Sequence, residues 1–268
     1  MAVDGPIGVF DSGIGGLTVV RALQAELPHE DIVYFGDTAR LPYGTKSAET
    51  IARFAIEDAG FLVERGVKLV VVACHSASSA ALEELVRSCP VPVLGVIEPG
   101  TRALVAATRS NRVAVIGTAL TIAAGAYERA IRALRADVQI VAKATPLFVS
   151  LAEEGWLENE VAEMTARRYL DGIAAGGVDA LLLGCTHFPL LIQVITRVLG
   201  EGVRVVDSSA ETARAVKELL DARGLATSRE GRGQLKFFLS DIAPRFETVG
   251  ARFLGAPLED VTRATVGT

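Results

Sequence analysis

Two cysteines end two matching stretches of the chain. Residues 66–74 align without a gap with residues 177–185, and the last positions are Cys74 and Cys185. Before each cysteine runs a continuous apolar segment such as Leu69–Val72, which is typical of a parallel strand buried on both faces. Such a strand presents its last residue at the carboxyl edge of the sheet, where ligands of open α/β folds bind. The repeat therefore predicts two thiols at equivalent functional positions.

Two thiols on opposite sides of one cleft suit acid–base chemistry on both faces of a single carbon. One thiolate removes the proton from an α-carbon, and the opposite thiol delivers a proton to the other face, which inverts the configuration. The ordinary thiol pKa is about 8.5 and neighbours can lower it, so both forms are accessible near neutral pH. A buried cysteine without such a context is most often a small core residue, and this is our interpretation of Cys89, which precedes Pro90.

Polar residues at other predicted strand ends could assist the thiols. Asp11 follows a short apolar strand at residues 7–10, and His187 follows Cys185 by two positions. They are the candidate neighbours of Cys74 and Cys185, although Asp11 is equally well explained as the cap of the following helix. Small hydroxyl residues, together with backbone N–H groups at helix N-termini, would hold substrate carboxylates. These are Ser12, Ser76, Thr118, Thr121 and Thr186.

Two loops rich in turn residues also follow predicted strands. Residues 11–17 contain three glycines, which let the backbone approach a ligand closely, but they lack the spacing of a nucleotide-binding motif. Residues 36–44 follow a strand predicted at residues 31–35. This second loop is either functional or a tight surface turn.

The order of elements repeats along the chain. Helices are predicted at residues 18–26, 48–64, 99–108, 121–134 and 158–174, and further strands at residues 91–96, 112–116, 138–142 and 203–206. This alternation predicts an α/β protein with two similar parallel-sheet lobes, related by a pseudo-twofold, and an active site in the cleft between them. A final strand, Leu235–Leu239, and a helix at residues 244–254 should return to the first lobe. We assign residues 1–98 with 208–268 to the first lobe and residues 99–207 to the second.

Composition limits the partners and the compartment. Half of the 268 residues are hydrophobic, the net charge is −5, and no basic tract occurs, so nucleic acid is not expected as the primary partner. Three cysteines without disulfide spacing favour a reducing compartment, and we expect a cytoplasmic protein. The N-terminal residues do not resemble a signal peptide. No apolar run approaches the roughly 18 residues of a membrane span, so no membrane association is expected.

With these residues in place, the chain resembles the glutamate racemases of the cofactor-independent aspartate/glutamate racemase superfamily. The matching motifs are Asp11-Ser-Gly-Ile-Gly-Gly-Leu17, Pro42-Tyr43-Gly44, Ala73-Cys74, Glu153-Glu154-Gly155 and Gly184-Cys-Thr-His187-Phe-Pro-Leu190. The resemblance extends from Ile7 to about Leu254. It implies interconversion of L- and D-glutamate without a cofactor, which supplies D-glutamate for peptidoglycan. It further implies two catalytic cysteines, with Cys74 deprotonating D-glutamate and Cys185 deprotonating L-glutamate.

The resemblance also implies the substrate contacts. By position they fall on Asp11, Ser12, Tyr43, Gly44, His75, Ser76, Thr186 and His187, and the matching motifs add Pro42 and Glu153. One position departs from the family, in which the first cysteine is usually followed by Asn-Thr, whereas this chain has His75 and Ser76. We expect His75 to position substrate by donating a hydrogen bond, as the amide would. Because an unperturbed histidine titrates near about pH 6.5, activity should then change between about pH 6 and 7.5.

Three alternatives remain open at this point. Cys74, His75, Cys185 and His187 could form a zinc site, but the usual C-x₂₋₄-C and H-x₃₋₅-H spacings are missing, so no metal is expected. A two-lobed protein could instead bind a small molecule without catalysis. A racemase or isomerase of the same superfamily could act on aspartate or another acid. The sequence also leaves the oligomeric state open, with a homodimer as one option.

Overall fold

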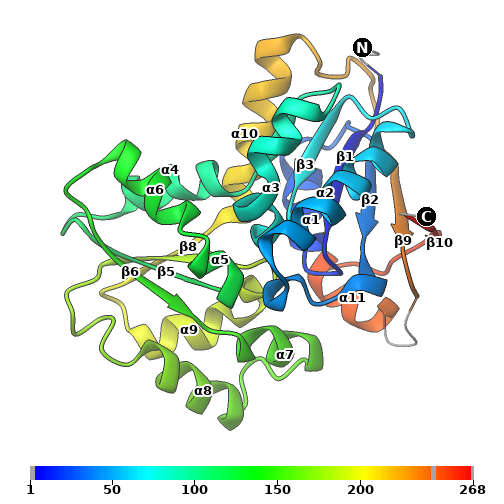
Figure 1. Ribbon diagram of the computed structural model, residues 1–268. Helices are drawn as coiled ribbons and strands as arrows, with labels where there is room; N and C mark the ends of the chain where they lie inside the picture. Colours follow the sequence, from blue (N-terminus) through cyan, green and yellow to red (C-terminus); the bar gives the residue numbers. More distant parts are fainter. Residues whose placement is uncertain (1–3, 243–245, 267–268) are drawn as a thin grey trace.

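The computed structural model describes residues 4–242 and 246–266, and its strands form two parallel sheets (Figure 1). The first sheet contains β1 (Ile7–Asp11), β2 (Ile32–Gly36), β3 (Leu69–Val72), β4 (Val93–Gly95), β9 (Leu235–Leu239) and β10 (Val261–Arg263). The second contains β5 (Arg112–Gly117), β6 (Gln139–Ala144), β7 (Ala180–Gly184) and β8 (Arg204–Asp207). The order β2-β1-β3-β4 in the first sheet corresponds to β6-β5-β7-β8 in the second. This repeated order confirms the predicted pair of similar α/β lobes.

Helices cover both faces of the first sheet. They are α1 (Leu17–Glu26), α2 (Ala48–Val63), α3 (His75–Ser88), α10 (Ser208–Arg223) and α11 (Phe246–Leu254). Because successive side chains of a strand point to opposite faces, the strand residues divide between two cores. Phe10 and Val72 pack with Ile51 of α2, whereas Val9 packs on the other face with Leu17 of α1. The strand β9 pairs in parallel with β2, so the end of the chain returns to this lobe, as expected.

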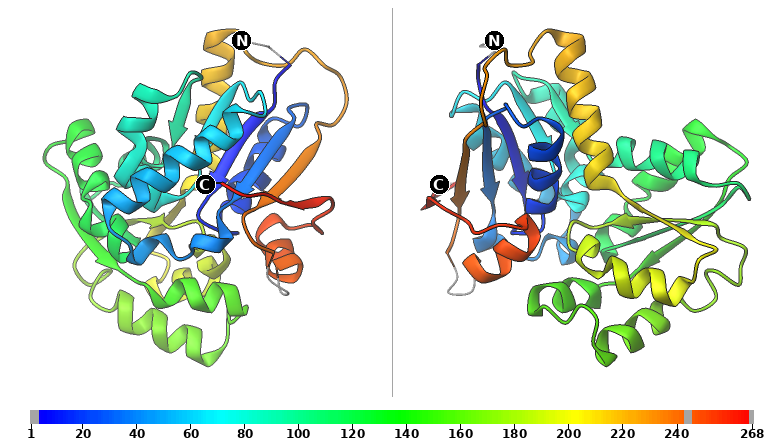
Figure 2. Two further views of the ribbon diagram at one scale, coloured as in Figure 1. Left: turned by 45° about the vertical axis from the view of Figure 1, so that its right-hand side comes forward. Right: turned by 180° about the vertical axis from the view of Figure 1, so that it is seen from behind.

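The second lobe is built in the same way. Its helices are α4 (Ile97–Ala107), α5 (Ala119–Ala123), α6 (Ala126–Leu134), α7 (Leu147–Glu154), α8 (Glu160–Leu170) and α9 (Ile192–Leu199). Val113 and Leu182 pack on one face with Leu104 of α4. Ile116 and Leu183 face the other way and belong to the same apolar core as the α1 face of the first sheet. One continuous apolar core therefore joins the two lobes, which lie side by side in both views of Figure 2.

The structure differs from the predicted elements in several details. The helix expected at residues 121–134 is two helices, because Gly125 between α5 and α6 has a φ of 64°. That left-handed conformation is open to glycine but costly for other residues. The short edge strand β10 was not predicted. Of the helix expected at residues 244–254, the described part is α11, and residues 244–245 lie outside the described residues.

We propose that the boundaries between the lobes lie after residues 98 and 207. The first sheet draws its strands from residues 7–95 and 235–263, and the second from residues 112–207, which supports these limits. Leu104 of α4 is buried in the core of the second lobe, and so is Ile97, which lies just before the first proposed boundary. The helix α10 packs on α1 of the first lobe as well as on α4. Among the described residues, membrane-spanning helices of sufficient length and hydropathy are absent.

Candidate active site

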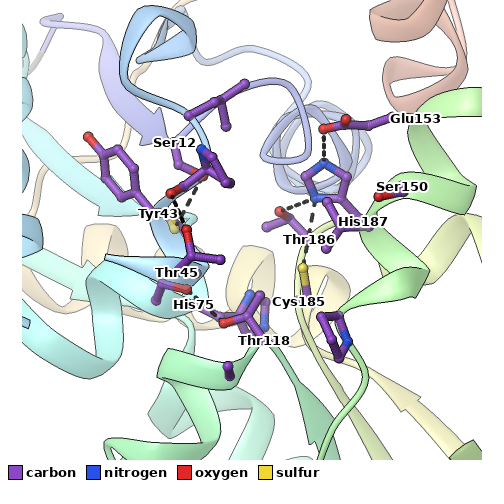
Figure 3. A pocket seen from close by; sticks show the side chains of 18 of the residues that line it. Ser12, Tyr43, Thr45, His75, Thr118, Ser150, Glu153, Cys185, Thr186 and His187 are labelled. Atoms are coloured by element: carbon purple, nitrogen blue, oxygen red, sulfur yellow. Dashed lines mark hydrogen bonds and ion pairs between the residues drawn. The ribbon is translucent and has the colours of Figure 1, made fainter. Parts of the chain in front are cut away.

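A cavity of about 410 Å³ lies between the lobes, where β1, β3, β5 and β7 end. Both predicted thiols line it, so the topology brings the two halves of the repeat to one place. Of the residues singled out from the sequence, Ser12, Pro42, Tyr43, Gly44, Cys74, His75, Ser76, Thr118, Glu153, Cys185, Thr186 and His187 line this cavity (Figure 3). Asp11 and Thr121 lie behind its wall, where they contact lining residues.

The first thiol stands at the start of a helix. Cys74 follows β3 and occupies the N-cap position of α3, and its Sγ lies 3.6 Å from Oγ of Ser12. Burial, and then the charge of Asp11, raise the pKa of the Cys74 thiol to about 12, and hydrogen bonding with Ala77 and Ser12 opposes that rise. The charge of Cys185 acts in the same direction, which places the two sulfurs within electrostatic reach of each other. The raised pKa favours the protonated thiol of Cys74, which can act as an acid.

The second thiol belongs to a row of three side chains. Sγ of Cys185 lies 3.8 Å from Nδ1 of His187, whose Nε2 lies 3.1 Å from Oε1 of Glu153 (Figure 3). Burial alone would lower the pKa of His187, but the hydrogen bonds to Cys185 and Glu153 outweigh it and raise that pKa to about 10. A protonated imidazole thus stands beside the second sulfur and can exchange a proton with it. The two thiols have chemically different neighbours.

Asp11 is wholly buried at the end of β1. Its carboxyl accepts from the backbone N–H of Gly13 at 3.0 Å and from the hydroxyl of Thr186 at 3.5 Å. Burial raises the pKa of this carboxyl, and the charge of His187 opposes that rise. The N-cap position of α1 is Gly16, so Asp11 is not the residue that begins this helix. Asp11 acts on the cavity through the charge that it directs at Cys74.

A hydroxyl network crosses from one lobe to the other. Oγ of Ser76, in α3, lies 3.0 Å from Oγ1 of Thr118 and 3.2 Å from Oγ1 of Thr121. Thr118 also caps α5 by accepting from the backbone N–H of Thr121. These side chains come from the carboxyl ends of β3 and β5, as the sequence predicted. Their hydroxyl protons can rotate toward a carboxylate in the cavity.

His75 lines the cavity and contacts a residue that the sequence analysis did not single out. Its Nε2 lies 3.0 Å from Oγ of Ser208 at the start of α10, and its buried Nδ1 has no hydrogen-bond partner among the described residues. Burial, together with the charge of His187, lowers the pKa of His75 to about 3. The expected titration near pH 6.5 is therefore wrong, and His75 is neutral at physiological pH. The contact with Ser208 could not be predicted, because Ser208 lies 133 positions after His75 in the chain.

The loop after β2 forms a wall of the cavity and is not a detached surface turn. Pro42, Tyr43 and Gly44 line it. A Cβ placed on Gly44 would lie 2.7 Å from Cβ of Thr118, so this loop of the first lobe approaches the second lobe as closely as glycine allows. Sequence reasoning missed the lining residues Leu41, Thr45, Ala119, Pro146, Leu147, Val149 and Ser150. Leu41 and Thr45 adjoin a motif already recognised, whereas the apolar residues of α7 carry no chemical signal.

The four side chains considered for a zinc site point to different partners. His75 contacts Ser208, and His187 lies between Cys185 and Glu153. Over residues 4–242 and 246–266, no three His, Cys, Asp or Glu side chains converge in an arrangement suited to a metal ion.

Comparison with known proteins places the chain among racemases. Residues 17–216 match the model of the Asp/Glu/Hydantoin racemase family. A glutamate racemase from Geobacter metallireducens is 54% identical over 260 residues, which cover 97% of this chain and 96% of that protein. The crystal structure of glutamate racemase from Francisella tularensis in complex with D-glutamate has a TM-score of 0.92 at 36% identity and covers 99% of this chain and 98% of its own. The crystal structure of glutamate racemase from Thermus thermophilus in complex with β-chloro-D-alanine has a TM-score of 0.89 at 45% identity. The match covers 99% of this chain and 98% of that chain. The chain therefore belongs to the Asp/Glu/Hydantoin racemase family.

Proposed function

We propose that this protein interconverts L- and D-glutamate by proton transfer at the α-carbon. The observation that carries the proposal is the pair of thiols, Cys74 and Cys185, at equivalent strand ends of two lobes around one cavity. A carbon held between them can lose a proton on one face and gain one on the other. The relatives that match this chain over nearly their whole lengths are named glutamate racemases, which supports glutamate as the substrate.

In the direction from L-glutamate, the Cys185 thiolate removes the α-proton and the Cys74 thiol donates its proton to the opposite face. Cys185 ends as a thiol and Cys74 as a thiolate, so the number of protons is unchanged. The reverse direction starts from the opposite protonation states. His187, held by Glu153, exchanges a proton with Cys185, and the buried Asp11 acts on Cys74 through its charge. Because one thiolate accepts the α-proton and the opposite thiol donates a different proton, the proposed chemistry needs no added cofactor.

Hydroxyl and backbone groups around the thiols would hold the substrate carboxylates. Ser12 lies beside Cys74, Ser76 and Thr118 lie where the lobes meet, and Thr186 lies beside Cys185. Two features limit the space for the side chain of the substrate. They are the wall formed by Pro42, Tyr43 and Gly44, and the neutral ring of His75. The N-terminus of α3, directly after Cys74, adds backbone N–H groups that favour an anion.

Exchange of the α-proton in D₂O tests this function and its closest alternative. Purified protein should incorporate deuterium at the α-carbon of either enantiomer of glutamate, with no pyridoxal phosphate or metal added. The same assay with L- and D-aspartate measures the preference between the two acids. Faster exchange of aspartate would replace glutamate as the substrate, and no exchange with either acid would favour a non-catalytic binding protein.

Further expectations concern the use of the product, the compartment and the oligomeric state. We propose that its product is D-glutamate for peptidoglycan, made in the cytoplasm, where the three free cysteines would stay reduced. A homodimer remains a proposal as well, and sedimentation of the purified protein over a range of concentrations tests it.

A further inference from the structure

A buried cluster of ionisable groups lies directly behind the wall of the cavity. The hydroxyl of Tyr43, a lining residue, is hydrogen-bonded to Oδ2 of Asp37 and lies 3.0 Å from Oδ2 of Asp58. The side chains of both aspartates are fully buried. Arg40 joins them, with its Nε 2.6 Å from Asp37 and its Nη2 2.8 Å from Asp58.

The number of protons in this cluster follows from its hydrogen bonds. A phenol has one proton, so Tyr43 can donate to only one of the two carboxyls. The other must itself be protonated and donate to the phenol oxygen, because an ionised carboxylate facing that oxygen would be repelled. Asp37 receives donors on both oxygens, from Arg40 on Oδ2 and from the Ser240 hydroxyl on Oδ1 at 2.9 Å. Asp37 is therefore the acceptor of the Tyr43 proton, and the hydrogen-bond count assigns the extra proton to Oδ2 of Asp58.

We propose that Asp58 is a neutral carboxylic acid that donates to Tyr43 and so positions the 42–45 wall of the cavity for substrate binding. Asp58 is a positioning residue, since it acts on the cavity through Tyr43. The charged groups that face it are Asp37 after β2, Arg40 in the short helix Thr38–Arg40, and Glu57 beside it in α2. Burial, and next the charge of Asp37, raise the pKa of Asp58 well above its usual value, in agreement with the hydrogen-bond count.

Loss of this proton should loosen the wall. With Asp58 ionised, Tyr43 faces two carboxylates and can satisfy only one. Tyr43 precedes Gly44, which touches Thr118 of the other lobe, so a displaced Tyr43 changes the width of the cavity. Resting on the proposed function, we expect the KM for glutamate to rise at alkaline pH by fivefold or more through the ionisation of Asp58. The alkaline change of kcat follows the thiols and His187 and should be the same with and without Asp58.

Infrared spectroscopy tests the proton without reference to any substrate. We subtract the spectrum of Asp58→Asn from that of the wild-type protein at pH 7. The difference should contain the carbonyl band of a protonated carboxylic acid. The subtraction separates Asp58 from Asp11, whose pKa is also raised. Glu57→Gln is the matched control, since Glu57 contacts Arg40 but is partly exposed, and its difference spectrum should lack that band. A difference spectrum for Asp58→Asn that shows only an ionised carboxylate would overturn the proposal, even if glutamate is racemised.

Kinetics then test the positioning role. An asparagine at position 58 mimics the neutral acid, because its amide N–H₂ can donate to Tyr43 and its oxygen can accept from Arg40. Asp58→Asn should therefore keep the wild-type KM at pH 7 and lose the alkaline rise, whereas Asp58→Ala should raise KM tenfold or more at both pH values. Should the alanine variant fail to fold, the pH profile of Asp58→Asn is sufficient. An alkaline rise of KM that persists unchanged in Asp58→Asn would refute the role.

Discussion

At the scale of single residues, the two thiols sit in different environments although the sequence repeat makes them equivalent. Burial and the nearby carboxyl of Asp11 raise the pKa of the Cys74 thiol. Cys185 instead lies beside the imidazole of His187, whose own pKa is raised. The pair is therefore asymmetric, because each thiol has a chemically different neighbour. The side chains that create the asymmetry, Asp11 and His187, follow strands in different halves of the chain.

Replacing either thiol by a hydroxyl should abolish most of the racemisation. A serine at position 74 or 185 has a far higher pKa than cysteine and is a poor base near neutral pH. Because acid–base groups contribute roughly 10²- to 10⁴-fold, Cys74→Ser and Cys185→Ser should each lower kcat a hundredfold or more. The half-buried Cys89 provides the control, and Cys89→Ala should leave kcat unchanged. Near-normal racemisation by either serine variant, followed by circular dichroism of glutamate, would refute the two-thiol mechanism.

The pKa of His187 should depend on Glu153. This pKa is raised to about 10 in the folded protein, above the unperturbed value of about 6.5. Protonation of His187 therefore stabilises the fold fully below about pH 6.5, and that contribution is lost as the pH rises through about 10. Glu153→Gln removes an anionic acceptor and should lower the pKa, which NMR titration of the imidazole measures. Glu158→Gln, on a surface ion pair with Arg197, is the control. Identical His187 titrations in Glu153→Gln and wild type would contradict this assignment.

His75 should not govern the pH dependence of activity between pH 6 and 7.5. Because its pKa is lowered to about 3, the ring is neutral across that range. His75→Asn should then leave the shape of the pH–rate profile unchanged and keep kcat within about tenfold, equivalent to roughly 1.4 kcal/mol of transition-state stabilisation. A change of shape between pH 6 and 7.5, or a hundredfold fall in kcat, would show that His75 takes part in proton transfer.

The sequence predicted residues that bear chemistry next to strand ends, and it failed where the environment decides. Cys74, Cys185 and His187 could be found because the apolar run before each site marks a buried strand. The neutral state of His75 depends on burial and on Ser208, which only the fold brings near. The same holds for Asp58, which lies inside a helical pattern and meets Tyr43 only in three dimensions.

At the scale of elements, backbone conformations at glycines decide where helices break. Gly125 has a φ of 64° between α5 and α6, and a Cβ there would meet only the flexible ends of Arg129 and Glu128. Gly125→Ala should therefore destabilise the protein mainly through its left-handed backbone, by about 1–2 kcal/mol. Gly60, exposed within α2 with nothing near a Cβ, is the matched comparison. Gly60→Ala should stabilise by about 0.5–1 kcal/mol. Urea denaturation measures both, and equal shifts in the same direction would contradict the argument.

The elements themselves were largely predictable. Strands such as Leu69–Val72 and Ala180–Gly184 are fully buried. Their uninterrupted apolar composition follows from that burial, which is why they could be predicted. The break at Gly125 was missed because the periodicity of apolar residues continues across it. The strand β10 was missed because its three residues are partly exposed at a sheet edge and carry no apolar pattern.

At the scale of the whole molecule, the cavity depends on how closely the lobes approach each other. A continuous apolar core joins them behind the cavity, and the hydroxyls of Ser76 and Thr118 link them at its edge. The repeat predicted two lobes and a cleft, but the distance between the lobes is set by packing, which has no periodic signal in the sequence. Gly44 is the position at which that distance can be tested.

Adding one methyl group at Gly44 should push the lobes apart. The new Cβ would lie 2.7 Å from Cβ of Thr118, a contact that real side chains do not make. Overpacking of this kind costs about 1–3 kcal/mol, so Gly44→Ala should lower the midpoint of thermal unfolding and raise the KM for glutamate. Gly60→Ala again serves as the control.

A second substitution separates this lobe contact from a local effect on the loop. Thr118→Gly removes the opposing Cβ, and glycine is tolerated at a helix N-cap at a cost of only a few tenths of a kcal/mol. If the clash between lobes is the cause, the double variant Gly44→Ala/Thr118→Gly should be more stable than the sum of the single changes predicts, by about 0.5–3 kcal/mol of coupling. Additive single changes would mean instead that the alanine strains its own loop, and that the space between the lobes is not set by Gly44.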